Sequence, residues 1–96
     1  MFLFILVLYS MSMSRAFVLL NCDIGSENEI VREVKSIPGV SRASKVAGVY
    51  DVIADVRAES DGDIARIVRA FGSIESIRSS LTMVVSEQDA PGKMVK

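Results

Sequence analysis

Histidine and tryptophan are absent from this sequence of 96 residues, and cysteine occurs once, at Cys22. A single cysteine cannot form a disulfide within the chain, which favours a reducing compartment, and we expect the protein in the cytoplasm. Zinc sites and acid–base catalysis commonly use histidine side chains, and this sequence has none to supply. We therefore predict no metal and no cofactor, and we interpret Cys22 as a small buried apolar residue on a strand.

An excess of charge of either sign is also missing. Lys and Arg together number 11 and Asp and Glu number 12, so the formal net charge is −1, and the charged residues are spread along the chain. Binding to nucleic acid phosphates needs clustered cations, so we expect no direct contact with nucleic acid. The length fits one domain, and a domain this small gains stability from association.

Long apolar runs are absent as well. Residues 1–14 (MFLFILVLYSMSMS) are uncharged, but their apolar run is shorter than the roughly 20 residues that span a membrane, and no basic segment of a secretory signal precedes it. We expect these residues to lie outside the domain and to make no membrane contact. A natural start at Met11 or Met13 is one explanation, a strand-like or partner-contacting segment is the next, and a membrane anchor is the least favoured.

What is present predicts alternating strands and helices. Runs of β-forming residues bounded by turn signals predict four strands, at residues 16–23, 40–48, 51–58 and 77–86. Apolar residues at helical spacing predict one helix after the first strand and one after the third. We expect each helix to begin at a capping box, Ser26 with Glu29 and Ser60 with Asp63. A Pro-Gly pair at 38–39 should end the first helix.

The first strand is apolar on both faces. Phe17 and Leu19 point to one side, and Val18, Leu20 and Cys22 point to the other. A strand of an antiparallel sheet with one solvated face would usually alternate apolar and polar residues. We therefore predict that both faces of this strand become buried.

An internal repeat supports this order of elements. A shift of 34 residues aligns Ile30 with Ile64 and Val34 with Val68. Two such units, each preceded by a strand, predict an α+β fold, a ferredoxin-like βαββαβ sandwich. Right-handed crossovers would place both helices on one face of a four-stranded antiparallel sheet. The other face would be free for a second subunit, as in a dimeric α+β barrel.

The motifs of common active sites are missing, including Gly-rich phosphate loops and paired cysteines. What remains is Gly48, Tyr50 and Asp51 at the hairpin that joins the second and third strands, and Ser80 and Thr82, which share one face of the last strand. The Asp51 carboxylate could receive a ligand ammonium, and the hydroxyls could hold a polar end. The alternative is purely structural: a turn glycine, a hairpin cap and a solvated strand face.

Residues 16–85 resemble the ligand-binding domain of the Lrp/AsnC transcription regulators, also called the RAM domain. The resemblance rests on Ile-Pro-Gly-Val at 37–40, then Gly-x-Tyr-Asp at 48–51 before an apolar strand, and a hydroxyl-x-Thr strand at 80–82. It implies a domain over residues 15–87, followed by a flexible tail at 88–96. Such a domain is not an enzyme: it dimerises through its sheet and assembles into rings.

The resemblance also implies that small effectors, typically amino acids, bind where dimers meet. Gly48, Tyr50 and Asp51 would belong to the effector loop, and Ser80 and Thr82 to the strand facing it. Ser80 departs from the family, which usually has threonine there, so the identity of the amino acid is open.

We expect no helix-turn-helix before residue 15, so the chain resembles a stand-alone RAM protein. It would modulate transcription or metabolism of amino acids by assembling with itself or with full-length Lrp/AsnC regulators. Two other functions stay open: an ACT-like regulatory subunit of a metabolic enzyme, and an enzyme on a dimeric α+β barrel. An enzyme on a dimeric α+β barrel would use His or Trp to form its pocket, and this sequence contains neither.

Overall fold

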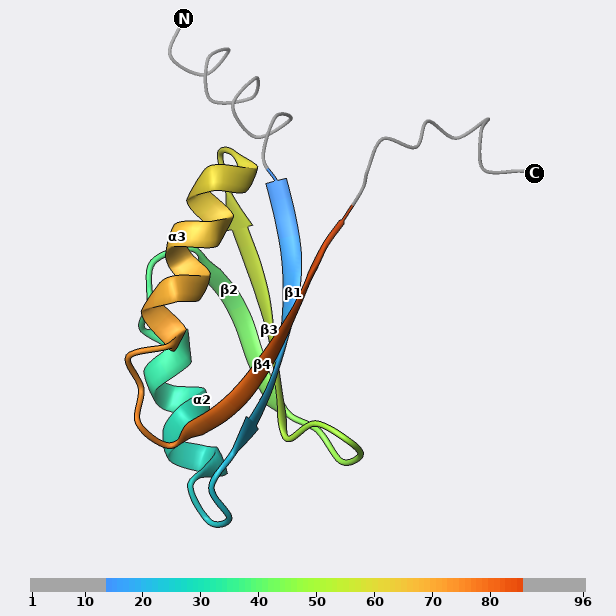
Figure 1. Cartoon of the computed structure of the whole chain (residues 1–96), viewed down its shortest axis with the longest axis vertical. Helices are drawn as coiled ribbons and strands as arrows, with labels where there is room; N and C mark the ends of the chain where they lie inside the picture. The colour runs from blue at the N-terminus through green and yellow to red at the C-terminus, as the bar shows by residue number, and fades with distance from the viewer. Residues whose placement is uncertain (1–13, 86–96) are drawn as a thin grey trace, which may run out of the picture.

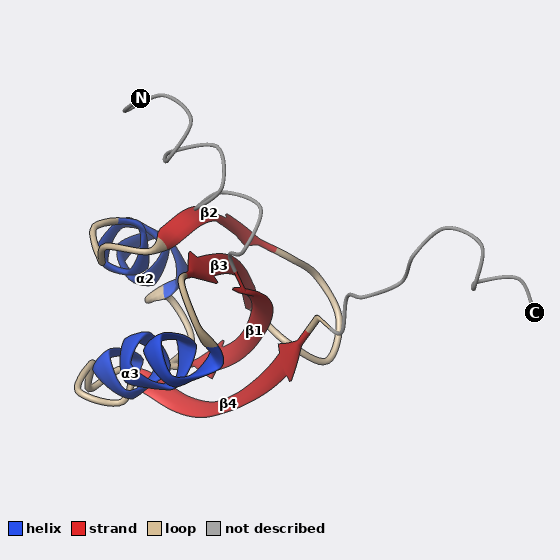
Figure 2. Ribbon diagram, turned by 90° about the horizontal axis from the view of Figure 1, so that it is seen from above, coloured by secondary structure: helices blue, strands red, loops and turns tan. Residues whose placement is uncertain are grey.

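The structure is a computed structural model that describes residues 14–85. Its elements are β1 (Ser14–Cys22), α2 (Glu27–Lys35), β2 (Val40–Lys45), β3 (Val52–Ala58), α3 (Asp61–Phe71) and β4 (Ile77–Val84). The strands form one antiparallel sheet in the order β2-β3-β1-β4. Both helices lie on the same side of this sheet (Figures 1 and 2). The predicted ferredoxin-like βαββαβ sandwich is therefore confirmed.

The core lies between the helices and one face of the sheet, the helix-covered face. Strand alternation directs every second residue of β1 and β3 to this face. All of these except the half-buried Ser14 are buried: Ala16, Val18, Leu20, Cys22, Val52, Ala54, Val56 and Ala58. Cys22 is thus the small buried residue that the sequence predicted. The intervening residues point to the other side, which we call the open face.

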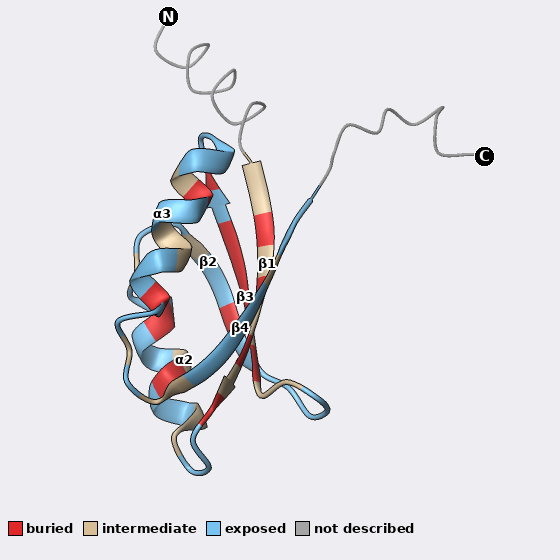
Figure 3. Cartoon of the chain, viewed as in Figure 1, coloured by how far each residue is buried: buried red, intermediate tan, exposed pale blue. Residues whose placement is uncertain are grey.

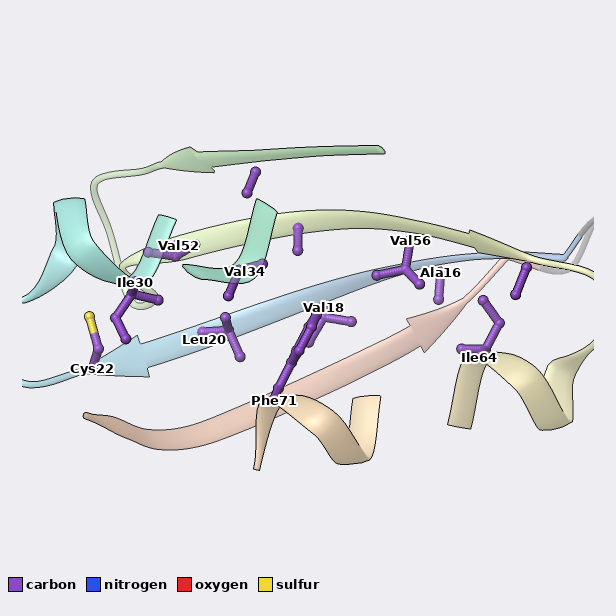
Figure 4. Packing of buried hydrophobic residues seen from close by; sticks show 13 residues of the cluster. Ala16, Val18, Leu20, Cys22, Ile30, Val34, Val52, Val56, Ile64 and Phe71 are labelled. Carbon is purple, nitrogen blue, oxygen red and sulfur yellow. The ribbon is translucent and has the colours of Figure 1, made fainter. Parts of the chain in front are cut away.

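Each helix contributes its apolar stripe to this core. Ile30 and Val34 of α2, and Ile64 and Phe71 of α3, are buried against the sheet, as Figure 4 shows. Full burial of side chains of this size removes apolar surface from water and contributes about 1.5–3 kcal/mol each. Within residues 14–85, neither helix is long and apolar enough to cross a membrane.

The two helices begin differently, which corrects one prediction. The Ser60 hydroxyl accepts a hydrogen bond from the Asp63 N–H at 3.1 Å, as expected for a capped helix. The Ser26 hydroxyl makes no such bond, because it donates instead to the Asp23 carbonyl oxygen at 2.7 Å. The predicted capping box at Ser26 is therefore wrong: this hydroxyl closes the preceding turn.

The hairpin between β2 and β3 is longer than the sequence predicted. β2 ends at Lys45 rather than at residue 48, and β3 begins at Val52 rather than at residue 51. Gly48 has a φ of +149°, a left-handed conformation that interrupts a strand. At the sheet's other end β1 begins earlier than predicted, at Ser14, which pairs with Ala58. The last strand, predicted to residue 86, ends earlier, at Val84; residue 86 itself lies outside the described residues.

Gly39 connects α2 to β2 through a left-handed turn, with a φ of +101°. Its carbonyl oxygen accepts a hydrogen bond from the Arg57 N–H at 2.8 Å, which joins the turn to β3. A Cβ at this position would collide with the Ile67 side chain and lie 3.3 Å from the Arg57 carbonyl oxygen. The conformation and the close packing both require glycine here.

We expect Gly39→Ala to destabilise the fold by about 1–3 kcal/mol, through left-handed strain and the clash with Ile67. Gly62→Ala is the control, because a Cβ there meets only the Ser60 hydroxyl at 3.7 Å and favours the helix. Urea unfolding of both variants measures the difference. Equal stability of Gly39→Ala and wild type would show that the turn tolerates a side chain.

Candidate functional site

The predicted loop residues lie together at one end of the sheet, in the hairpin between β2 and β3 (Figure 1). Gly48 is exposed, and Tyr50 and Asp51 are half-buried. A hydrogen bond from the Val46 N–H to the Asp51 carbonyl oxygen, 2.9 Å long, closes the hairpin. The structural role considered for Gly48, a turn glycine, is present in the structure.

Asp51 ties this hairpin to the end of β1. Its N–H donates to the Leu20 carbonyl oxygen at 2.9 Å, and its Oδ2 accepts from the Cys22 N–H at 2.9 Å. The carboxylate thus caps a strand end, which is the structural alternative considered for it. Its second oxygen, Oδ1, has no hydrogen-bond partner among residues 14–85, so it can accept a further donor.

Ser80 and Thr82 lie on β4, at the sheet edge on the far side of β1 from the hairpin. They pair with Leu20 and Val18, so both hydroxyls project on the helix-covered side, and their common face is confirmed. Ser80 is exposed and Thr82 is half-buried. Most of β4 is exposed, as its colouring in Figure 3 shows.

The structure does not bring Asp51 and the two hydroxyls together within one chain. β1 lies between them, and two strand spacings of about 4.8 Å place them roughly 10 Å apart. The α-ammonium and α-carboxylate of an amino acid are attached to one carbon and cannot bridge that separation. One chain therefore supplies each half of the predicted site separately.

A pocket of about 490 Å³ adjoins Asp51, and residues that the sequence did not predict line it. They are Glu27, Lys45, Val46 and Ala47, with Asp51. Glu27 and Asp51 together outweigh Lys45, so the pocket favours a ligand that carries a positive group. The acidic first turn of α2 was visible in the sequence, but its position beside Asp51 follows from the tertiary arrangement.

A second polar cluster lies on the open face, around Asp55, the one buried charged side chain within residues 14–85. Arg15 binds its carboxylate with both ends of the guanidinium, Nε to Oδ1 at 3.1 Å and Nη2 to Oδ2 at 3.0 Å. Arg57 Nη2 lies 3.6 Å from Oδ2. The paired geometry fixes Asp55 in place.

Apolar side chains occupy the β4 side of the open face. Leu81, Met83 and Val85 are 44%, 49% and 39% exposed, and Leu81 and Met83 pair with the half-buried Leu19 and Phe17 of β1. Thus the open face of β1 is only half-buried in one chain, although the sequence predicted burial on both faces. Exposed apolar side chains gathered on one face mark an interaction surface.

Metal chemistry finds no support in the described part of the chain. Residues 14–85 contain no group of three or more Cys, Asp or Glu side chains arranged to hold a metal ion. Cys22 is buried, and its N–H is committed to Asp51.

The sequence profile of the Lrp/AsnC ligand binding domain matches residues 15–93. Two curated relatives are uncharacterized HTH-type transcriptional regulators, from Pyrococcus furiosus and Pyrococcus horikoshii, 33% and 34% identical over 73 residues. Each match covers 72% of this chain and 49% of the relative, so the chain spans about half the length of these relatives. A homocitrate synthase of Sulfurisphaera tokodaii is 27% identical over 56 residues, 58% of this chain and 12% of the enzyme.

Solved structures share the fold. A protein of Thermus thermophilus has a TM-score of 0.75 and 22% identity, over 80% of this chain and 98% of that one. A hypothetical protein of Pyrococcus horikoshii has a TM-score of 0.72 and 26% identity, over 78% and 92%. A transcriptional regulator of Neisseria meningitidis, in complex with L-Met, has a TM-score of 0.67 and 14% identity, over 78% and 51%.

The Asp55 cluster makes the stability of the fold depend on pH. Hydrogen bonds from Arg15 hold the pKa of the Asp55 carboxyl below its ordinary value of 3.8, against the effect of burial, and Arg57 acts in the same direction as Arg15. Since the lowered pKa belongs to the folded state, the ionised carboxylate stabilises the fold above about pH 3.8, and this stabilisation is lost as the pH falls through the lower, folded-state pKa.

We expect Asp55→Asn to lower the thermal midpoint by several degrees at pH 7, and this difference from wild type to shrink as the pH falls below 3.8. Asp23→Asn is the control, because its ion pair with Arg78 joins two exposed side chains and should contribute little. Thermal melts from pH 7 to 3 measure both variants. A difference at Asp55 that stays constant with pH would contradict the electrostatic explanation.

Proposed function

Because this chain belongs to the Lrp/AsnC ligand binding domain family, we propose that it binds a small amino acid effector and assembles with copies of itself. Through that assembly it modulates transcription or metabolism of amino acids. The observation that carries the proposal concerns Asp51. One of its carboxylate oxygens accepts the Cys22 N–H, and the other has no hydrogen-bond partner within residues 14–85. The residue also lines a pocket.

The chemistry of this pocket suits an ammonium group. Asp51 can form a charge-assisted hydrogen bond to it, and the negative balance of Glu27, Lys45 and Asp51 favours a cationic end. The carboxylate end of an amino acid then needs hydrogen-bond donors close by, and the hydroxyls of Ser80 and Thr82 are donors. The solved Neisseria meningitidis regulator with L-Met supports an amino acid as the class of effector.

The site requires a second chain to be complete. Since β1 separates Asp51 from Ser80 and Thr82 within one chain, we place the effector where Asp51 of one copy meets the strand hydroxyls of another. A ligand held between copies stabilises the assembled state over the separate chains. Effector concentration would thereby set the degree of assembly, with copies of this chain or with full-length Lrp/AsnC regulators.

The open face is the proposed surface for the first step of assembly. Its exposed Leu81 and Met83 lie on the edge strand β4, and the exposed Val85 directly follows that strand. Both helices cover the other side of the sheet (Figure 2). A two-fold pair would place the same face of each copy against the other and would cover these side chains along with the half-buried Phe17 and Leu19. The resulting pair would be the dimeric α+β barrel that the sequence predicted.

A regulatory role beside a metabolic enzyme is the second candidate. The similarity to 12% of a homocitrate synthase favours it, because it shows that related segments occur within an enzyme. A regulator of an enzyme would change the turnover rate of that enzyme when the amino acid is added. A partner of a transcription regulator would instead change the assembly state of the regulator, which sedimentation measures.

We expect wild type to be a dimer or larger at micromolar concentration, and Met83→Glu to shift it toward monomer, because a charge would be buried in the paired faces. Arg32→Glu, on the exposed side of α2, is the control and should leave the mass unchanged. Size-exclusion chromatography with light scattering reads the mass. A monomeric wild type would rule out assembly through the open face.

We expect Asp51→Asn to weaken amino acid binding by about 1.5–3 kcal/mol, or roughly one to two decades in affinity. Asparagine keeps an acceptor for the Cys22 N–H but removes the charge, so it separates binding from folding better than alanine. Glu59→Gln, beyond the opposite end of β3, is the control. Calorimetry of wild type against the twenty amino acids comes first, and the site is wrong if none binds below a few millimolar or if Asp51→Asn binds as tightly as wild type.

A further inference from the structure

The charged side chains on the open face are mostly of one sign. Strand alternation directs four of them to this face: Arg15 of β1, Arg42 of β2, and Asp55 and Arg57 of β3. Three positive charges and one negative charge give the face a balance of +2. The whole chain has a formal net charge of −1, so its excess of acidic residues lies outside this face.

Asp55, the one carboxylate among these four side chains, is already bound by two arginines. Arg15 donates to both of its oxygens, at 3.1 and 3.0 Å, and Arg57 lies 3.6 Å from one of them. Arg42 is opposite Asp55 in the ladder between β2 and β3, but its guanidinium has no ion pair or hydrogen bond with any residue from 14 to 85. Arg42 is therefore the cation of this face that can accept a carboxylate from another chain.

A hollow of about 240 Å³ beside Arg42 leaves room for a side chain of a partner. Ser44, Ile53 and Phe17 also line it. At about 30 Å³ for each water molecule, the hollow has the volume of about eight waters, and an Asp or Glu side chain has fewer non-hydrogen atoms than that. A carboxylate in the hollow would accept the paired N–H donors of Arg42, and the exposed Ser44 hydroxyl would be a further donor.

The open face of a second, identical copy supplies no free carboxylate for this hollow. Each copy brings the same +2 balance and the same Asp55, which Arg15 and Arg57 already bind. Packed sheets lie about 10 Å apart, close to the Debye length of about 8 Å at physiological ionic strength, so like charges on the two faces still repel. Burial of the exposed Leu81 and Met83 drives the pairing of identical copies, and the arginines oppose it.

We propose that the open face pairs more tightly with the sheet face of a different chain, one that presents an Asp or Glu side chain to Arg42, than with a second copy of this chain. The inference rests on the proposed assembly through the open face and adds the chemistry of the partner. Such a partner keeps the apolar contacts to Leu81 and Met83 and replaces repulsion at Arg42 by a charge-assisted pair. A domain of the same fold with an acidic sheet face meets this requirement.

Repulsion between identical faces and attraction between unlike faces together determine the choice of partner. This chain would therefore form mixed pairs in preference to pairs of its own copies wherever an acidic counterpart is present. Its self-pairing would be the weaker association that remains when the counterpart is absent.

The variant Arg42→Glu supplies an acidic group on the same face and is the partner used in the test. Isotope-labelled wild type is mixed with an equal amount of Arg42→Glu until subunits have exchanged, and native mass spectrometry counts the pairs. We expect mixed pairs to outnumber the two kinds of identical pairs taken together, which random exchange would only equal. Arg32→Glu, the same charge reversal on the exposed side of α2, is the matched control and should mix at random.

Salt should act in opposite directions on the two kinds of pair. Raising NaCl from about 50 to 500 mM should strengthen the pairing of wild type with itself and weaken its pairing with Arg42→Glu, because salt screens repulsion and attraction alike. Sedimentation measures both dissociation constants. An equal response of the two kinds of pair to salt would contradict the electrostatic explanation.

Arg42→Gln is a second variant that removes the charge without reversing it. Its pairing with itself should be about threefold or more tighter than that of wild type, since each face loses one positive charge. Arg42 is exposed, so the thermal midpoint of the variant should match that of wild type. A pair of Arg42→Gln copies no tighter than the wild-type pair would overturn the proposal.

The outcomes separate this proposal from assembly itself. Random mixing of Arg42→Glu with wild type, while wild type still forms pairs, would overturn the preference and leave assembly through the open face intact. Pairs that form only in the mixture would support the preference in its strongest form. If wild type pairs neither with itself nor with Arg42→Glu, assembly through the open face is wrong, and the preference is wrong with it.

Discussion

β1 lies between β3 and β4, so each of its side chains must face either the helices or the open side of the sheet. Val18 and Leu20 fill the core, while Phe17 and Leu19 form the centre of the open face. A one-residue shift in pairing would exchange these two sets. The bond from the Cys22 N–H to Asp51 and the paired bonds from Arg15 to Asp55 hold β1 against the hairpin and β3 near its two ends, and both polar clusters depend on that alignment.

The two clusters give this small domain two regions of opposite charge. Around Asp51 the carboxylates outnumber the ammonium of Lys45, and on the open face the guanidiniums outnumber Asp55. The Asp51 pocket lies at the hairpin end of the sheet, and the Asp55 cluster lies on the open face. The overall net charge of −1 conceals this separation, because it averages over the chain.

The order of strands and helices could be predicted from the sequence. Apolar residues recur about every two residues in a strand and about every three and a half in a helix, and these spacings can be seen within a short stretch of sequence. The buried sets of β1, β3, α2 and α3 follow from them. The start of α2 was predicted incorrectly, because the Ser26 hydroxyl had two possible partners and a local motif does not decide between them. The hairpin limits depended on the backbone of Gly48, which sequence does not give.

The arrangement of the candidate sites was harder to predict from the sequence than the fold. The elements carrying Asp51, Ser80 and Thr82 were predicted, but their separation by β1 follows from strand order. Arg15 and Asp55 are 40 residues apart in the chain, so their ion pair has no local signature. Charged residues that are scattered along a sequence can still meet on one face of a sheet.

The position of β4 has a consequence for local motion. Among residues 14–85, β4 pairs only with β1, and its residues are exposed or half-buried. No strand of the described part of the chain lies beyond its outward N–H groups, in contrast to those of β1, which is paired on both sides. Amide hydrogen exchange should therefore be faster along the outer side of β4 than in β1, so that the sheet can open from this edge. Any partner that covers β4 would suppress that opening and become visible as protection of its amides.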